Sequence, residues 1–325
     1  MSKTVSLARA LIKTAVIMVG APLAVVALLG AIHFPFETDG PVDVSADEIT
    51  ADSQEFYEEI YSPVIDAESA PTDDHKYVQI GQEANSNKGI VEAVTEFVDR
   101  YNLRQGRVLE VGAGSGQLQD IVDDYTGLDI AASAKRYFHK PFVAGSATDL
   151  PFADNEFDAL WTVWTLEHVP NPELALREAR RVVKPGGYLF LAPAWLCNSW
   201  AAEGYQVRPY EDFDIAGKLA KATLVVRANA YYRSAGLVGS RVARRLVFPP
   251  NNPTDLRYTA LEANFDEYWV ADSDAVNSLD PHEVMLWHTS RGDECLNCPD
   301  AVGDQLLMGQ LALEIRVNKS ESFAD

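Results

Sequence analysis

The chain is short of cysteine and of positive charge. Only Cys197, Cys295 and Cys298 occur among 325 residues, so a framework of disulfides is excluded and the fold must rest on a hydrophobic core. The 27 Lys and Arg are outnumbered by 48 Asp and Glu, which gives a formal net charge of -21. Such a protein repels a phosphate backbone, so we expect no nucleic-acid partner. Because 47% of the residues are apolar, disorder is excluded as well.

Charged residues are absent from residues 14–36, which read TAVIMVGAPLAVVALLGAIHFPF. These 23 residues are long enough to cross a bilayer as a helix, and Pro22 does not prevent one. We therefore predict a membrane anchor over residues 1–36, with its transmembrane part at about 14–36. A cleaved signal peptide stays open as an alternative, because three cations precede the apolar run.

Lys and Arg are absent from residues 37–74, which contain 13 Asp and Glu. Like charges repel one another and three prolines interrupt the segment, so we expect a solvated acidic tether. A short helix between Asp47 and Tyr61 is compatible with the pattern.

Residues 75–193 alternate between helix and strand patterns. Apolar residues at helical spacing predict a helix over residues 87–101, a second one after the first strand, and a third over 172–183. The third has helix-start signals in Asn171 and Pro172 and is ended by a Pro-Gly-Gly turn. Strands are expected at 107–111, 127–130, 142–144, 157–163 and 188–192. They are apolar runs rather than alternating ones, which predicts an α/β fold with a doubly wound, mostly parallel sheet.

The first strand runs into a glycine-rich turn, Gly112-Ala-Gly-Ser-Gly116. A turn at the carboxyl end of such a strand is where ligands bind in doubly wound sheets. Gln117 stands where the dinucleotide fingerprint needs Gly or Ala, and the Gly-Lys-Ser/Thr ending of a phosphate loop is missing, so neither NAD nor ATP is favoured. Acids accompany successive strands at Glu110, Asp129 and Asp149. Three carboxylates around one crevice suit a ligand with an amine, a ribose and a positive charge.

In these motifs residues 87–193 resemble the class I S-adenosylmethionine-dependent methyltransferases. VLEVGAGSGQL is similar to the first motif of that family, GLDI to its second, ATDLPFADNEFDAL to its third with the fourth strand, and LEHVPNPELALREARRVVKPGGYLFLAP to its next helix, turn and fifth strand. The resemblance implies S-adenosyl-L-methionine as cofactor and a Rossmann-like seven-stranded sheet of order 3-2-1-4-5-7-6 with an antiparallel last strand. The two remaining strands are expected at 258–270 and 283–289.

The resemblance also implies roles for single residues. Glu110 would orient the methionine end, Asp129 would hold the ribose, and Asp149 with the Leu150 backbone would recognise the adenine. The remaining cofactor-binding residues implied are Gly112, Gly114, Gly116 and Thr162. His168 is the catalytic candidate, because a hydroxyl or protonated amine acceptor needs a base; a hydrogen-bonding or capping role is the alternative. No metal is expected.

Residues 194–255 form a long insertion before the expected final strands and tail at 256–325. Between residues 215 and 250 the insertion carries seven Lys and Arg and no acid. Two interpretations are open: a basic amphipathic surface against anionic lipid, or a lid that pairs with acids of the protein itself. Cys295 and Cys298 are expected as loop thiols, because a zinc site with the nearby histidines matches no standard spacing.

We therefore expect an S-adenosylmethionine-dependent methyltransferase that acts on a small-molecule or lipid-like acceptor. Its partners would be that substrate and the membrane, through the anchor and, on the lipid-facing interpretation, the basic insertion. A nicotinamide-dependent oxidoreductase and a noncatalytic membrane-tethered binding module are the alternatives. Flanking charges would place residues 37–325 outside the cytoplasm. Since the charged cofactor is made in the cytoplasm, we nevertheless expect a single-pass membrane protein with a cytosolic domain.

Overall fold

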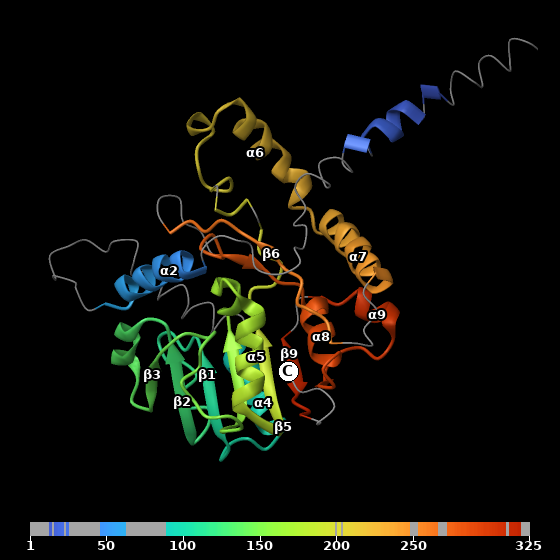
Figure 1. The fold of residues 1–325 in the computed structure, drawn as a ribbon. Coiled ribbons are helices and arrows are strands. Elements are labelled where there is room, and N and C mark those ends of the chain that lie inside the picture. Colours follow the sequence, from blue (N-terminus) through green and yellow to red (C-terminus); the bar gives the residue numbers. More distant parts are fainter. Residues whose placement is uncertain are drawn as a thin grey trace, which may run out of the picture.

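A seven-stranded sheet forms the centre of the molecule (Figure 1), in the order β3-β2-β1-β4-β5-β9-β8. The computed structural model describes residues 13–14, 16–22, 24–25, 46–62, 89–198, 200–202, 204–247, 253–265, 272–309 and 312–319. The strands are β1 (Arg107–Val111), β2 (Asp124–Asp129), β3 (Phe142–Ala144), β4 (Phe157–Val163), β5 (Val183–Ala192), β8 (Glu294–Cys295) and β9 (Leu313–Arg316). The first five pair in parallel, whereas β9 is antiparallel to both β5 and β8. The predicted mostly parallel α/β sheet is confirmed.

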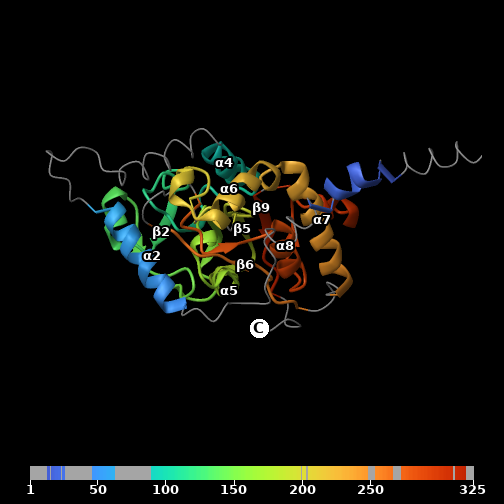
Figure 2. The same ribbon diagram turned by 90° about the horizontal axis from the view of Figure 1, so that it is seen from above.

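Helices cover both faces of this sheet (Figures 1 and 2). Helix α4 (Ile90–Arg100) lies on one face, and α5 (Pro172–Val182) with α8 (Pro281–Thr289) on the other. Phe97 of α4 packs against Phe190, and their ring centroids are 5.3 Å apart. Successive strand side chains point to opposite faces, and most positions of β1, β2 and β4 are buried. This two-sided burial explains the apolar runs of the central strands.

The start of α5 forms as its sequence signals predict. The Asn171 side chain accepts a hydrogen bond from the Leu174 N–H at 3.1 Å, and Pro172 occupies the first turn. Arg177 lies 2.8 Å from Glu173, one helical turn away. The helix leads directly into β5, which places the fifth strand beside β4.

The last two strands are not where the sequence places them. Residues 283–289 belong to α8, whose start is capped by Asp280, and residues 281–288 are all buried. Of the described residues within 258–270, only Thr259–Ala260 (β6) form a strand, and it pairs with β7 (Asn277–Ser278) in a separate sheet. A fully buried helix has no polar face, so its apolar run is easily mistaken for a strand.

The prediction of a helix between the first two strands is also wrong. Turns connect β1 to β2 over residues 112–123, and β2 begins three residues earlier than expected, at Asp124. Tyr125 lies opposite Val108 in the parallel ladder. Leu118 and Val122 are buried in the core on the α4 face, so their spacing reflects burial and not a helix. A short 3-10 helix, η1 (Ala132–Tyr137), connects β2 with β3.

Part of the predicted acidic tether is instead a helix that packs on the domain. Helix α2 (Ala46–Ile60) lies over the ends of β2 and β3 (Figure 1). The Glu58 carboxylate accepts hydrogen bonds from the N–H groups of Ala132 and Ser133 at 2.5 and 3.0 Å, where η1 begins. Tyr57 and Tyr61 pack beside this contact. The rest of the predicted tether, apart from residues 61 and 62, lies outside the described residues.

The basic insertion is bound to the body of the protein through its second helix. It contains α6 (Ile215–Arg227) and α7 (Ala230–Val247). Arg241 of α7 makes two hydrogen bonds to the carboxylate of Asp280, at 2.8 and 2.9 Å, and Arg244 makes one to Glu283 at 2.7 Å. Both guanidinium groups are almost fully buried. For Arg241 and Arg244 the lipid-facing interpretation is therefore wrong, and pairing with internal acids is confirmed.

Two of the three cysteines form a disulfide. Cys295, at the end of β8, is bonded to Cys298, so the expectation of free loop thiols is wrong. Cys197 is a buried free thiol. In the described part of the chain no group of three or more His, Cys, Asp or Glu could hold a metal ion.

The predicted transmembrane segment lies largely outside the described residues. Within it, residues 14, 16–22, 24 and 25 are helical, and the side chains of Val16 to Val19 are exposed. None of the helices in the described ranges is long and apolar enough to cross a bilayer.

Candidate functional site

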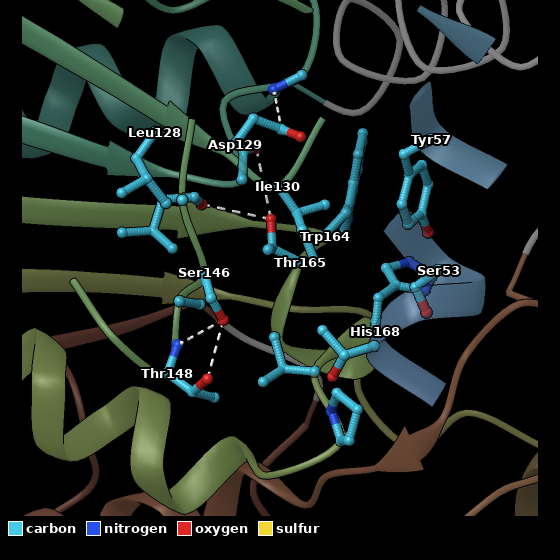
Figure 3. Close-up of a pocket in the computed structure, with 18 of the residues that line it drawn as sticks. Ser53, Tyr57, Leu128, Asp129, Ile130, Ser146, Thr148, Trp164, Thr165 and His168 are labelled. Atoms are coloured by element: carbon cyan, nitrogen blue, oxygen red, sulfur yellow. Dashed lines mark hydrogen bonds between the residues drawn. The ribbon is translucent and has the colours of Figure 1, made fainter. Parts of the chain in front are cut away.

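A pocket opens at the carboxyl ends of β1, β2 and β4, and α2 forms its outer wall (Figure 3). With its open mouth included, it holds about 740 Å³ of empty space. Its walls come from the glycine-rich turn, from the ends of β2, β3 and β4, and from the segment that contains His168. This is the edge at which the sequence predicted ligand binding.

The glycine-rich turn lies on the pocket floor and requires glycine. Gly112 and Gly114 line the pocket with φ values of 74° and 48°. A Cβ on Gly112 would lie 2.0 Å from Oγ1 of Thr165, and one on Gly114 would lie 2.9 Å from the Tyr61 hydroxyl. Gly116 also has a positive φ but is not among the lining residues. The backbone of this turn can therefore approach a ligand where no side chain would fit.

Asp129 ends β2 and lines the pocket with a nearly buried carboxylate. Oδ2 accepts the Gly114 N–H at 2.8 Å, and Oδ1 accepts the Ala131 N–H at 3.0 Å. Burial raises the pKa of Asp129, although these backbone hydrogen bonds counteract the shift. A carboxylate has about four acceptor sites, more than the backbone groups occupy, so Asp129 can still accept a hydrogen bond from a ligand hydroxyl.

Glu110 lies beneath the turn and not on the pocket wall. Its carboxylate is buried and accepts a short hydrogen bond from the Tyr125 hydroxyl. Burial raises the pKa of Glu110 to about 8, and the Tyr125 hydrogen bond only partly offsets that effect. The methionine-orienting role implied by resemblance stays a prediction, and any such contact would have to reach Glu110 past the turn.

The residues assigned to the adenine are arranged differently from the expectation. Asp149 is exposed and does not line the pocket, and the Leu150 N–H donates to the Glu178 carboxylate at 2.9 Å. Ser146 and Thr148 line the pocket instead, with their hydroxyl oxygens 2.8 Å apart. The loop after β3 folds back through a bridge between residues 146 and 149, and this turns the Asp149 side chain outward.

The residues after β4 form the wall next to the turn. Thr162 is buried within the strand and is not among the lining residues. Trp164 and Thr165, which follow it, do line the pocket, and Trp164 has a positive φ of 50°. The Thr165 hydroxyl lies 3.0 Å from the carbonyl oxygen of Val163. The contact predicted for Thr162 is thus available to its near neighbours.

His168 lies on the pocket wall and belongs to a buried polar network. Its Nδ1 is 3.2 Å from the backbone oxygen of Asp274 and 3.6 Å from its Oδ2, and its Nε2 is 3.8 Å from Oε1 of Glu167. The Tyr57 hydroxyl donates to Asp274 Oδ2 at 2.7 Å. Burial lowers the pKa of His168, but the charges of Asp274 and Glu167 outweigh burial and raise it.

Sequence reasoning missed the contribution of α2 to the pocket. Thr50, Ser53, Tyr57 and Tyr61 all line it, and Figure 3 shows Ser53 and Tyr57 on the helix side of the cavity. Three of these residues recur every fourth position, which is helical spacing. The Ser53 hydroxyl is buried without a hydrogen-bond partner in the described part of the chain, as expected of a group that contacts a ligand.

The residues present fit S-adenosylmethionine. The glycine turn provides a backbone cradle that a Cβ would obstruct, Asp129 can accept hydroxyl groups, and the unpartnered Ser53 hydroxyl can bind a polar group. Val111, Leu128 and Val169 contribute apolar surface between these groups. Bound there, the cofactor would supply an electrophilic methyl group.

Comparison with known proteins agrees with this fit. Residues 109–191 match the family described as "Methyltransferase domain". Demethylmenaquinone methyltransferase of Renibacterium salmoninarum is 43% identical over 96 residues, which are 26% of this chain and 40% of that protein. Fatty-acid O-methyltransferase of Mycolicibacterium smegmatis is 31% identical over 147 residues, which are 38% of this chain and 54% of that protein. The chain therefore spans about half or less of the length of these relatives.

Solved structures of methyltransferases are similar over a part of the chain. A methyltransferase of Thermotoga maritima, described as a possible histamine N-methyltransferase, is 22% identical with a TM-score of 0.32, and the match covers 42% of this chain and 60% of that one. The sequence matches thus carry what is known of the family: residues 109–191 match a methyltransferase domain, and the Renibacterium and Mycolicibacterium relatives are methyltransferases.

Proposed function

We propose that the protein transfers a methyl group from S-adenosylmethionine to a small-molecule acceptor. The observation that carries this proposal is the position of Asp129 and the glycine turn in one pocket, inside the stretch that matches the methyltransferase domain. Asp129 would hold the ribose hydroxyls, and Gly112 and Gly114 would allow close approach of the cofactor. Ser146 would take the adenine side in place of Asp149.

Methyl transfer is an in-line displacement that needs alignment and exclusion of water. Helix α2 supports both, since it closes the outer side of the pocket with Tyr57 and Tyr61. His168 would accept the proton of the acceptor, because it is the imidazole on the pocket wall. The catalytic role is favoured over a capping role by its place beside a cavity.

Calorimetry with S-adenosylhomocysteine tests the cofactor assignment. Asp129→Ala should weaken binding at least tenfold, because charge-assisted hydrogen bonds of roughly 1.5 to 3 kcal/mol are lost. Asp149→Ala is the matched control and should leave the affinity unchanged, since that side chain is exposed outside the pocket. If the two variants behaved in the opposite way, the sequence-based adenine site would be right and this pocket wrong. Tight binding of NADH by the parent protein would favour an oxidoreductase.

We propose separately that the N-terminal segment is a single-pass membrane anchor and that residues 37–325 lie in the cytosol. The uncharged run of residues 14–36 and the exposed apolar side chains of its described part support it. Protease added to sealed vesicles of known orientation should cleave after the anchor only from the cytosolic face. Cleavage from the other face would show that the domain has the opposite orientation. Recovery of the protein in the soluble fraction would contradict the anchor itself.

A further inference from the structure

The pocket has a second polar centre, at the opposite side from the ribose-binding Asp129. It is built by His168, Asp274 and Tyr57, which belong to three segments far apart in the chain. Asp274 is 1% exposed and has no cation within ion-pair distance among the described residues except the imidazole of His168. A buried carboxylate needs such a partner, so the pair is a built feature of the site.

Asp274 fixes the orientation of the imidazole. Its backbone oxygen lies 3.2 Å from Nδ1 of His168 and its Oδ2 lies 3.6 Å from the same atom, so Nδ1 is the nitrogen that carries a proton on this side. The Tyr57 hydroxyl holds Oδ2 at 2.7 Å, and its ring meets the imidazole edge to face with centroids 6.0 Å apart. With Nδ1 engaged, Nε2 is the nitrogen left to accept a proton.

Among the described residues, the charged groups that face His168 are all acidic. Glu167 faces it from the same 3-10 helix, Asp272 and Asp274 from the segment before β7, and Tyr57 from α2. An imidazolium formed at this point is stabilised by these carboxylates. An acceptor with a carboxylate at its reacting end would be repelled by them. An ammonium would be attracted by them, but it has no lone pair with which to attack the methyl carbon, so the reacting group must be neutral.

We propose that Asp274 and Tyr57 position His168 as the proton acceptor for a neutral hydroxyl group, and that this end of the pocket takes the acceptor substrate. This inference rests on the proposed methyltransferase function. It adds two positioning residues, one from α2 and one from the segment before β7, and a chemical class of acceptor. Helix α2 thus takes part in the reaction site as well as covering it.

In the proposed step, each bond that forms is matched by a bond that breaks. An oxygen lone pair of the acceptor forms the new bond to the methyl carbon while the carbon–sulfur bond of the donor breaks, and that electron pair stays on sulfur. The hydroxyl proton passes to Nε2 of His168. The resulting imidazolium lies between Glu167 and Asp274, and the products are a methyl ether and a neutral thioether.

Titration of the imidazole by NMR tests the positioning role without any acceptor. In the full-length protein with labelled histidine, a His168→Gln variant identifies the signal. We expect His168 to titrate above the ordinary histidine pKa of 6.5, and Asp274→Asn to bring its midpoint down. Tyr57→Phe should move the midpoint up, because the carboxylate then directs its whole charge at the imidazole. Asp120→Asn, which removes the partner of the exposed His139, is the matched control and should leave His168 unchanged.

A midpoint below 6.5 in the parent protein overturns the positioning role even if Asp274→Asn fails to fold. Equal midpoints in the parent, Tyr57→Phe and Asp274→Asn overturn it as well. Binding of S-adenosylhomocysteine is measured in the same samples. If the parent protein does not bind it, the proposed function fails, independently of the positioning role tested here.

The acceptor class is tested with two probes on the complex with S-adenosylhomocysteine. Hydroquinone is expected to shift the His168 signal, and hexanoate at neutral pH is not. A shift of the His168 signal on addition of hexanoate counts against a neutral hydroxyl acceptor. The absence of a shift with both probes counts against it as well. The rate of methyl transfer to hydroquinone is measured with cofactor that carries a tritium-labelled methyl group. In Asp274→Asn we expect kcat to fall at least tenfold, with little change in KM.

Discussion

Replacing Arg241 by Met should destabilise the whole protein, although this residue lies in the insertion and far from the pocket. The guanidinium is 1% exposed and makes two hydrogen bonds to Asp280, with two more to the backbone oxygens of Leu306 and Met308 at 2.9 and 2.8 Å. Its removal leaves the Asp280 carboxylate buried without a counter-charge. Breaking a buried pair in this way costs about 3 to 5 kcal/mol. Unfolding in urea, followed by circular dichroism, measures the loss.

Two further variants distinguish the loss of the buried Arg241–Asp280 pair from the simple loss of a positive charge. Arg241→Met with Asp280→Asn removes the stranded charge, and Asn can still cap α8 where Asp280 now accepts the His282 N–H at 2.8 Å, so most of the stability should return. Lys218→Met removes an exposed cation of the same insertion and should change stability by no more than about 0.5 kcal/mol. If Arg241→Met were as mild as Lys218→Met, the buried-pair argument would fail and a surface role for α7 would regain support.

Three other outcomes follow from the described contacts. Because burial raises the pKa of Glu110 to about 8, the parent should lose stability as the pH rises from about 4.5 to 8, and Glu110→Gln should flatten that dependence in urea unfolding. Gly112→Ala should abolish cofactor binding in calorimetry, whereas Gly186→Ala, with a similar positive φ but nothing within 4 Å of the new Cβ, should cost only about 1 to 2 kcal/mol of stability. Reducing the Cys295–Cys298 bond should lower stability by no more than about 2 kcal/mol, measured by thermal unfolding, because the loop that it closes is short.

The disulfide also bears on the side of the membrane. Disulfides persist in oxidising compartments and are rare in the cytosol. The structure joins Cys295 and Cys298 in a disulfide, which speaks against the cytosolic domain that we propose. Alkylation of whole cells before lysis, followed by mass spectrometry of the 294–319 region, decides the matter, because reduced thiols would support the cytosolic domain. Complete oxidation would support an external domain, in agreement with the charge bias around residues 14–36.

The parts of the fold that sequence predicted correctly are those with local signals. The β1 strand, the glycine turn and Asp129 lie within 23 residues, and α5 has its cap, proline and ion pair within its first two turns. Each of these features is determined by neighbours in the chain, so a pattern of residue types was enough to find them. Of the predicted site residues that line the pocket, Gly112, Gly114 and Asp129 belong to this group, and His168 lies outside it.

The failures have two physical causes. Residues 283–289 were read as a strand because α8 is buried on all sides and shows no amphipathic period. A short helix between Asp47 and Tyr61 is compatible with the sequence, and α2 forms there, but the acidic composition favours a solvated tether. The packing of α2 on the domain was missed because it depends on a few residues such as Glu58 and Tyr57. Composition averages over a segment and cannot register such single contacts.

The two ends of the pocket differ in how the chain builds them, and this explains why the donor was easier to identify than the acceptor. The donor end depends on residues 112–129, which form one continuous stretch. The acceptor end depends on Tyr57, His168 and Asp274, of which Tyr57 and Asp274 are 217 positions apart. Long-range contacts of this kind leave no spacing pattern in a sequence. At the acceptor end that we propose, only His168 lies within the recognised motifs, whereas Tyr57 and Asp274 come from α2 and from the residues before β7.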